Sequence, residues 1–249
     1  IAADNLMTYQ YNYVDHADDA VTVTNIYSET GEALTIPLDR RLSIIQNMQA
    51  YYKKYDKLKR AQKLLAVQQD ACRANIRHLE SIEASLDSST RLAEIAEIQE
   101  ELIASGYLHE KMPRKNKDRR AQPFSFTAPD GMTILVGKNN MQNDALTFRT
   151  AAPTDLWLHV RDIPGSHVIL RTDGGTPSEE TLHLAAQIAA HFSKARGSST
   201  VPVDYTAIRF VKKPSGSVPG FVRFTHEKTL FVTEDEEALA PILAQDPTV

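Results

Sequence analysis

Cationic side chains and flat rings recur together in the second half of this chain. Within residues 155–170, the period-two alternation of a strand places Trp157, His159 and Arg161 on one face. Residues 137–151 and 191–216 add lysines, arginines and amides. Cations can hold phosphates, and flat rings can stack on unpaired bases, so this pattern favours nucleic-acid binding. In the alternative, the cations pair only with neighbouring aspartates. For Trp157 itself we favour burial in the core.

A hydrolase site built on Ser166, His167 and Asp162 is disfavoured. Neighbouring residues in a strand point to opposite faces, and no G-x-S-x-G motif surrounds the serine. No C-x-x-C or H-E-x-x-H motif occurs. We therefore expect no catalytic residues, no metal and no cofactor.

The charge is unevenly distributed along the 249 residues, although the formal net charge is only −4. Residues 1–40 carry seven acidic residues and one arginine, whereas residues 111–120 carry six basic residues and one aspartate. Residues 194–228 hold seven basic and two acidic residues, and an acidic tail follows. Basic blocks of this kind indicate an anionic partner. No apolar run reaches the roughly 18 residues of a membrane span.

The first half of the chain predicts two short strands and a long helix. Residues 21–27 alternate as a strand should, and residues 34–38 form a second strand. Apolar or small residues then recur every seven positions: Ile44, Tyr51, Leu58, Leu65, Cys72, Leu79 and Leu86. This heptad row predicts a coiled-coil helix with these side chains, Cys72 included, in an apolar seam. A break at residues 87–90 and a stripe ending near Gly106 predict an antiparallel helical hairpin over residues 41–105.

The second half predicts a mainly antiparallel sheet domain. Strands are expected at residues 124–127, 132–136, 156–160, 167–171, 201–211, 219–225 and 229–233. One principal helix is expected near residues 178–195, with Ser178 as its cap. The fold class is therefore α+β: a long antiparallel coiled-coil hairpin followed by this sheet domain. The expected domains are a remnant at 1–40, a hairpin at 41–110, a basic linker at 111–122 and a globular domain at 123–249.

Ordered blocks of this domain resemble the RNA-binding domain of the NFACT family, some bacterial members of which are also described as fibronectin-binding proteins. The matching stretches are residues 137–139, 142–144, 157–162, 164–167, 193–196, 203–206, 212–214 and 228–230. Residues 52–57 are similar to the family's middle region, and residues 1–38 to the last strands of its amino-terminal domain. Val218 departs from the pattern, because many relatives carry a lysine there. Because the chain begins with Ile1, we expect it to be a fragment lacking most of the amino-terminal domain. The resemblance implies that tailing of stalled nascent chains needs that domain, so we expect this chain to be a binding module and not an enzyme.

The resemblance implies a role in ribosome-associated quality control. Family members join large ribosomal subunits whose nascent chains are stalled, recruit tRNA and extend the stalled chain without a template, with alanine in bacteria. The implied partners are tRNA and, through the coiled coil, the large ribosomal subunit, in the cytoplasm. The residues carried over as an RNA-binding set are Lys138, Asn143, Asp144, His159, Arg161, His167, Lys194, Arg196, Tyr205, Lys212, Lys213 and Lys228. We expect Lys138, Arg161, Lys194, Arg196, Lys212 and Lys213 to converge on one face and to contact tRNA phosphates, with Asn143 and Asp144 orienting neighbouring loops.

A second hypothesis from the same resemblance is a surface-exposed adhesin that binds host fibronectin. No wall-anchor motif and no repeated binding segments occur in the sequence, but a long coiled coil could display a protein-binding surface. The two activities are compatible in one protein. Binding to tRNA and to fibronectin, measured on one preparation, would discriminate between them.

Overall fold

The computed structural model describes residues 1–13, 18–109 and 121–246. The chain forms two compact units, residues 1–73 and 74–249, each described here by itself. Most of the basic linker expected at 111–122 lies outside the described residues. Within the part that the structure describes, no helix has the length and apolar character needed to cross a membrane.

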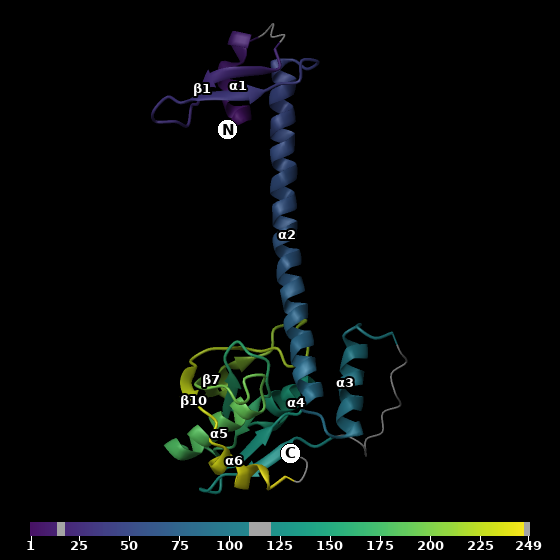
Figure 1. The fold of residues 1–249 in the computed structure, drawn as a ribbon, viewed down its shortest axis with the longest axis vertical. Coiled ribbons are helices and arrows are strands. Elements are labelled where there is room, and N and C mark those ends of the chain that lie inside the picture. The colour runs from purple at the N-terminus through teal and green to yellow at the C-terminus, as the bar shows by residue number, and fades with distance from the viewer. Residues whose placement is uncertain (14–17, 110–120, 247–249) are drawn as a thin grey trace. The chain divides into compact units, whose positions relative to one another are not determined.

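The first unit packs a helix and a hairpin against the start of a long helix (Figure 1). Helix α1 (Ala2–Tyr9) and the short turn η1 (Gln10–Tyr13) precede the antiparallel strands β1 (Ala20–Thr24) and β2 (Ala33–Pro37). Alternation along β1 turns Val21 and Val23 inward, as the sequence predicts. Helix α2 (Ile44–Asp87) begins in this core, where Ile44 is buried. The Tyr52 hydroxyl donates to Asp4 Oδ1 at 2.7 Å and so ties α2 to α1.

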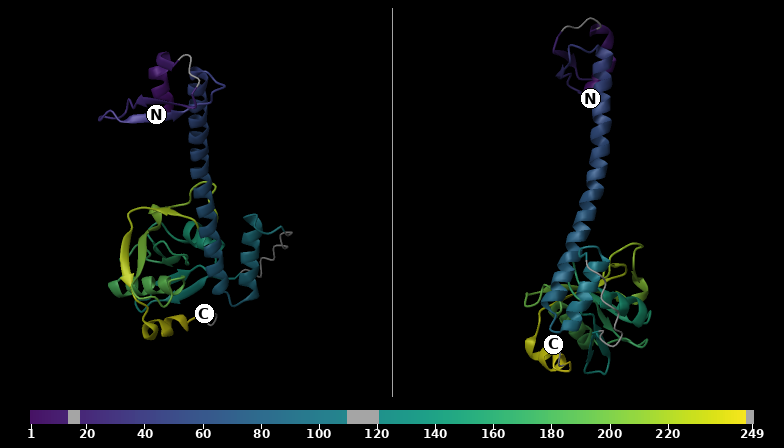
Figure 2. Two further views of the ribbon diagram at one scale, coloured as in Figure 1. Left: turned by 45° about the horizontal axis from the view of Figure 1, so that its top comes forward. Right: turned by 90° about the vertical axis from the view of Figure 1, so that its right-hand side faces the viewer.

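The predicted hairpin of helices is present, but the predicted apolar seam is not. Helix α3 (Leu92–Ala104) follows α2 after a short turn and runs back beside its last turns (Figure 2). Because α3 has only 13 residues against 44 in α2, it cannot cover most of the heptad row. Leu58 and Leu65 are each 58% exposed, and Cys72 is exposed as well. The prediction that Cys72 packs in a core is therefore wrong for the described chain.

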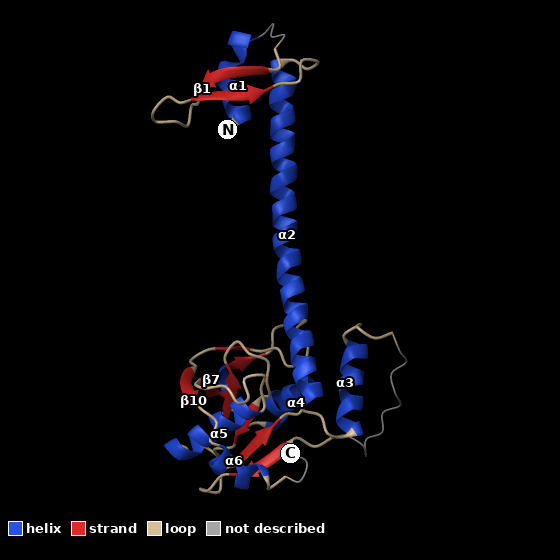
Figure 3. Ribbon diagram, in the orientation of Figure 1, coloured by secondary structure: helices blue, strands red, loops and turns tan. Residues whose placement is uncertain are grey.

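The second unit is built on a six-stranded antiparallel sheet with the order β10-β7-β5-β6-β4-β3 (Figure 3). Its strands are β3 (Phe124–Thr127), β4 (Thr133–Val136), β5 (Leu156–Val160), β6 (Val168–Leu170), β7 (Val201–Ala207) and β10 (Lys228–Val232). Helix α5 (Glu179–His191) is the expected principal helix, and Ser178 caps it by accepting from the Thr181 N–H. The mixed α+β fold is therefore confirmed.

Two apolar clusters cover the two faces of this sheet. On one face, α5 lays its alanines over Leu158, Val160 and Val203, and helix α6 (Glu236–Leu243) joins the same cluster. On the other face, Trp157 and Ile169 pack against Leu146 and Val211. The second face is covered by helix α4 (Asn140–Ala145), the π-helical segment η3 (Leu146–Thr150), the turn η4 (Ile208–Phe210) and the two-stranded ribbon of β8 (Val211–Lys212) and β9 (Arg223–Phe224).

Four helical elements were not predicted from the sequence: α1, α4, η3 and α6. Strands β7 and β8 were predicted as one strand. Helix α4 is only six residues long, and its polar sequence NMQNDA has no amphipathic period. Its first turn is set instead by the Asn139 side chain, which accepts a hydrogen bond from the Gln142 N–H. A cap of this kind depends only on neighbouring residues, whereas the face of the sheet on which α4 lies depends on residues distant in the sequence.

Candidate nucleic-acid interface

Trp157 lies in the core, as the sequence analysis favoured. It is 1% exposed and contacts Phe224 with 4.8 Å between ring centroids. Its indole Nε1 is buried without a hydrogen-bond partner among the described residues. Trp157 therefore anchors the α4 face of the sheet and offers no ring to a base.

The two histidines beside Trp157 are uncharged at neutral pH. His159 stacks on Trp157 at 5.6 Å, and His167 meets both rings edge-on. Burial lowers the pKa of His159, and burial together with the neighbouring His159 lowers the pKa of His167 to about 3. His167 is held by Thr147, whose hydroxyl lies 2.8 Å from Nδ1, and the backbone N–H of His167 donates to Asn143 Oδ1 at 3.0 Å. Neither ring can attract a phosphate by charge.

Arg161 carries a charge that the protein already compensates. Its guanidinium makes two hydrogen bonds to Asp204, of 3.0 and 2.7 Å, and it also donates to Thr229. Asp204 is almost wholly buried, whereas Arg161 remains 43% exposed. A bidentate pair of this kind orients the arginine, and its exposed edge remains available to solvent.

Asn143 and Asp144 connect α4 to neighbouring loops. Asp144 pairs with Lys213 and accepts the Gly220 N–H at 3.0 Å, which joins α4 to the segment between β8 and β9. Asn143 lies so close to Gly137 that a Cβ there would meet its Oδ1 at 2.1 Å. The motif that begins at Gly137 therefore requires glycine for a close approach of side chain to backbone.

Lys138 is not at the surface, in contrast to the prediction that it contacts phosphates. Its ammonium lies 2.9 Å from Glu94 Oε1 and 3.9 Å from the centroid of the Phe124 ring. Only 7% of the Lys138 side chain and 3% of Glu94 are exposed. Lys138 can lie in the interior because Glu94 of α3 pairs with it. Glu94 is distant in the sequence, so this pairing could not be predicted from the residues around Lys138. Lys138 is therefore not part of an exposed cationic surface.

Three glutamates of α3 hold the start of α4. Glu94 binds Lys138, while Glu97 accepts from Asn139 Nδ2 at 2.6 Å and from Gln142 Nε2 at 2.8 Å. Glu101 lies 2.9 Å from both Asn140 Nδ2 and His78 Nε2. The spacing of these acids on one helix face was a signal in the sequence, but it could equally have indicated a solvated face. The stretch 137–142 thus docks the end of the helical hairpin onto the sheet domain.

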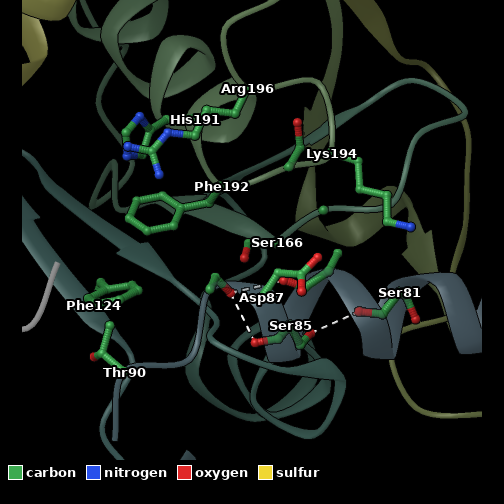
Figure 4. A pocket seen from close by; sticks show the side chains of 14 residues that line it. Ser81, Ser85, Asp87, Thr90, Phe124, Ser166, His191, Phe192, Lys194 and Arg196 are labelled. Atoms are coloured by element: carbon green, nitrogen blue, oxygen red, sulfur yellow. Dashed lines mark hydrogen bonds between the residues drawn. The ribbon is translucent and has the colours of Figure 1, made fainter.

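Lys194 and Arg196 follow the carboxyl end of α5 and line a cavity of about 320 Å³ (Figure 4). Serines from the last turns of α2, Ser166 and the half-buried ring of Phe192 also line it. Lys194 pairs with Glu83 of α2. The Arg196 guanidinium is exposed and makes neither a hydrogen bond nor an ion pair with the described residues.

The remaining residues of the predicted set do not all share a face. Tyr205 and Lys228 stand opposite each other in the β7–β10 ladder, and Tyr205 packs against the α5 cluster. His159 and Arg161 lie on the other face of the sheet, because β5 pairs His159 with Asp204 and not with Tyr205. Lys212 and Lys228 are exposed, and neither ammonium has a partner among the described residues. The described residues also contain no group of three or more His, Cys, Asp or Glu side chains placed to hold a metal ion.

Family comparisons assign this architecture to a known class. A family model described as the NFACT N-terminal and middle domains matches residues 1–121, and the NFACT protein RNA binding domain matches residues 122–223. The chain therefore belongs to the NFACT family, and most of the six-stranded domain corresponds to its RNA-binding domain.

Individual relatives agree with this assignment. The protein named Rqc2 homolog RqcH of Bacillus subtilis (strain 168) is 41% identical over 237 residues, which are 94% of this chain and 41% of the relative. The RqcH of Streptococcus suis (strain 05ZYH33) is 45% identical over 94% of this chain and 42% of its own length. The chain thus spans about two-fifths of these relatives. A solved structure, the C-terminal part of the fibronectin/fibrinogen-binding protein from Streptococcus suis, is 46% identical, with a TM-score of 0.71 over 79% of each chain.

Proposed function

We propose that this chain is the tRNA- and large-subunit-binding part of a ribosome-associated quality control factor. In this role it holds tRNA while a stalled nascent chain is extended with alanine without a template, in the cytoplasm. The match to the NFACT RNA-binding domain supports the proposal, together with the 41–45% identity to proteins named RqcH. The chain contributes binding to this reaction, and the tailing activity belongs to the longer protein.

The observation that carries the proposal is a set of exposed cations on the RNA-binding domain that no carboxylate neutralises. Arg196, Lys212 and Lys228 are of this kind among the described residues. Lys194, Arg161 and Lys213 each pair with a single carboxylate. A phosphate can compete for these three, because their side chains are partly exposed.

The members of the predicted set that carry no positive charge are proposed to supply hydrogen bonds or to hold loops. His159 offers a neutral ring for hydrogen bonding, and Tyr205 a hydroxyl on the opposite face of the sheet. His167, Asn143 and Asp144 are proposed to hold the loops, since their side chains bond to other parts of the protein.

The test measures tRNA affinity by fluorescence anisotropy over a range of salt concentrations. Replacing two unpaired cations in the variant Arg196→Glu/Lys212→Glu should weaken binding and lower the salt slope by roughly 1.4 to 1.8 units. The charge-matched control Lys63→Glu/Arg77→Glu alters exposed positions of α2 outside the RNA-binding domain and should bind tRNA as the unaltered chain does. Equal affinities and slopes for all three proteins would refute the proposal. Copurification of the full-length protein with large ribosomal subunits and tRNA tests the wider role.

Fibronectin binding is a second candidate, favoured by the similarity to the Streptococcus suis structure. The same preparation should be tested on immobilised fibronectin at physiological salt. Saturable binding that survives Arg196→Glu/Lys212→Glu would assign fibronectin to a different surface from RNA. No saturable binding would remove this candidate.

A further inference from the structure

Two cations face each other on the ribbon of β8 and β9. Lys212 is directly opposite Arg223 in this antiparallel pair, and both are exposed. Their neighbours Val211 and Phe224 belong to the Trp157 cluster, so the two cations point away from that core. Neither cation has a hydrogen bond or an ion pair from its side chain to any described residue. Like charges directly opposite one another destabilise a ladder unless an anion lies between them.

The adjacent residue Lys213 shows that this arrangement is specific. Lys213 is neutralised by Asp144, although it follows Lys212 directly. The protein thus supplies a carboxylate to one lysine and leaves the next without one. The unpaired cations Lys212 and Arg223 are therefore suited to an anion that comes from outside the chain.

A stacked pair of rings flanks the ribbon. Phe210 immediately precedes β8, and His226 lies two residues after β9; their ring centroids are 4.3 Å apart and their planes differ by 23°. The guanidinium of Arg209 lies 4.9 Å from the Phe210 centroid. His226 is exposed and adopts a φ of 59°, in the left-handed region that is uncommon for a residue with a side chain. Backbone strain of this kind at the surface is more common at binding sites than elsewhere.

We propose that this ribbon and ring stack bind an unpaired nucleotide of RNA, with Lys212 and Arg223 on its phosphates and His226 stacked on its base. The inference rests on the proposed RNA-binding function and specifies which part of an RNA is recognised. A base can stack on a side chain only when its face is free, and duplex RNA keeps its base faces covered. The site therefore selects loops, bulges or ends, and its cations alone would not make that distinction.

The test compares a fluorescent 12-nucleotide single-stranded RNA of mixed sequence with the same strand in a duplex, using the full chain. His226→Asn removes the ring but keeps a residue that tolerates a left-handed backbone. It should weaken binding of the single strand about tenfold and leave duplex binding unchanged within about twofold. Arg223→Gln should weaken both and lower the salt slope by roughly 0.7 to 0.9 units. Arg77→Gln, an equal loss of charge on the exposed part of α2, should change neither.

The outcomes separate this inference from the function on which it rests. If the unaltered chain binds neither of these RNAs nor tRNA, the proposed function fails, and the inference fails with it. If it binds tRNA but not the single strand, the inference alone is overturned. If the chain binds RNA but His226→Asn leaves single-strand affinity unchanged, or weakens duplex binding equally, the inference alone is overturned. Phe210→Leu, which keeps an apolar side chain but removes the second ring, should lower single-strand affinity in the same direction. Thermal melts of each variant check that the fold is retained.

Discussion

Breaking the buried pair of Lys138 and Glu94 should reveal how the helical hairpin is docked. Both side chains are nearly inaccessible, and the ammonium lies 2.9 Å from the carboxylate. Glu94 also accepts the backbone N–H groups of Thr90 and Arg91, at 2.9 and 3.2 Å, at the start of α3. Glu94→Leu therefore removes the carboxylate that pairs with a buried ammonium, together with two hydrogen bonds that cap the helix. We expect a loss of about 3–5 kcal/mol in the free energy of unfolding.

The partner variant should cost less. In Lys138→Met the Glu94 carboxylate keeps both backbone donors and remains at the start of a helix, where negative charge is favoured. The expected loss is about 1–3 kcal/mol, part of it from the lost contact of the ammonium with the Phe124 ring. The double variant Glu94→Leu/Lys138→Met removes both charges of the buried pair, so we expect it to be more stable than Glu94→Leu alone.

Urea titration followed by fluorescence measures these losses directly, because Trp157 is the only tryptophan and is buried in the same unit. The four proteins form a double-mutant cycle, and the interaction energy should be at least about 1 kcal/mol. Additive losses, with the double variant the least stable of the four, would refute the coupling.

Acid should weaken the contact between Lys138 and Glu94. Burial by itself raises the pKa of Glu94, but hydrogen bonds from Lys138 and the two backbone groups outweigh it and lower the pKa. The stability that the Glu94 carboxylate contributes is therefore present above the pKa that Glu94 has in the unfolded chain, and it is lost as the pH falls through the lower pKa of the folded state.

Four further predictions concern burial and close packing. Burial lowers the pKa of His167 to about 3, so the fold favours its neutral form. The free energy of unfolding should therefore fall by about 1.4 kcal/mol per pH unit below about pH 6.5. In urea titrations between pH 7 and 5, His167→Phe should make this fall less steep. Leu65→Asp should change the free energy of unfolding, obtained from thermal melts, by no more than about 0.5 kcal/mol, because Leu65 is exposed. A large loss of stability would show that the heptad row is covered in solution. The Cys72 thiol should react with a thiol reagent in the native protein as fast as in urea. Gly137→Ala should cost about 1–3 kcal/mol, because its new methyl group would collide with Asn143; an unchanged urea midpoint would contradict this.

The positions of the secondary-structure elements followed from short-range patterns. The hairpin of helices was predicted because the turn near residues 87–90 and the stop at Gly106 depend only on neighbours in the chain; Gly106 has a φ of 79°. Most strands were predicted because alternation with period two is local. Helix α4 was missed because its short polar sequence is ordered by caps and by distant carboxylates.

The sequence by itself determined the family, the α+β class, the order of the main elements and the types of residue available for binding RNA. Only the tertiary structure decided which of those residues face solvent. Lys138 became an interior cation because Glu94, 44 positions away, meets it there. Tyr205 and His159 fell on opposite faces because the β5–β7 register pairs His159 with Asp204. Leu65 stayed exposed because α3 is too short to cover it. Burial is a property of pairs of segments, and a pattern within one segment cannot specify its partner.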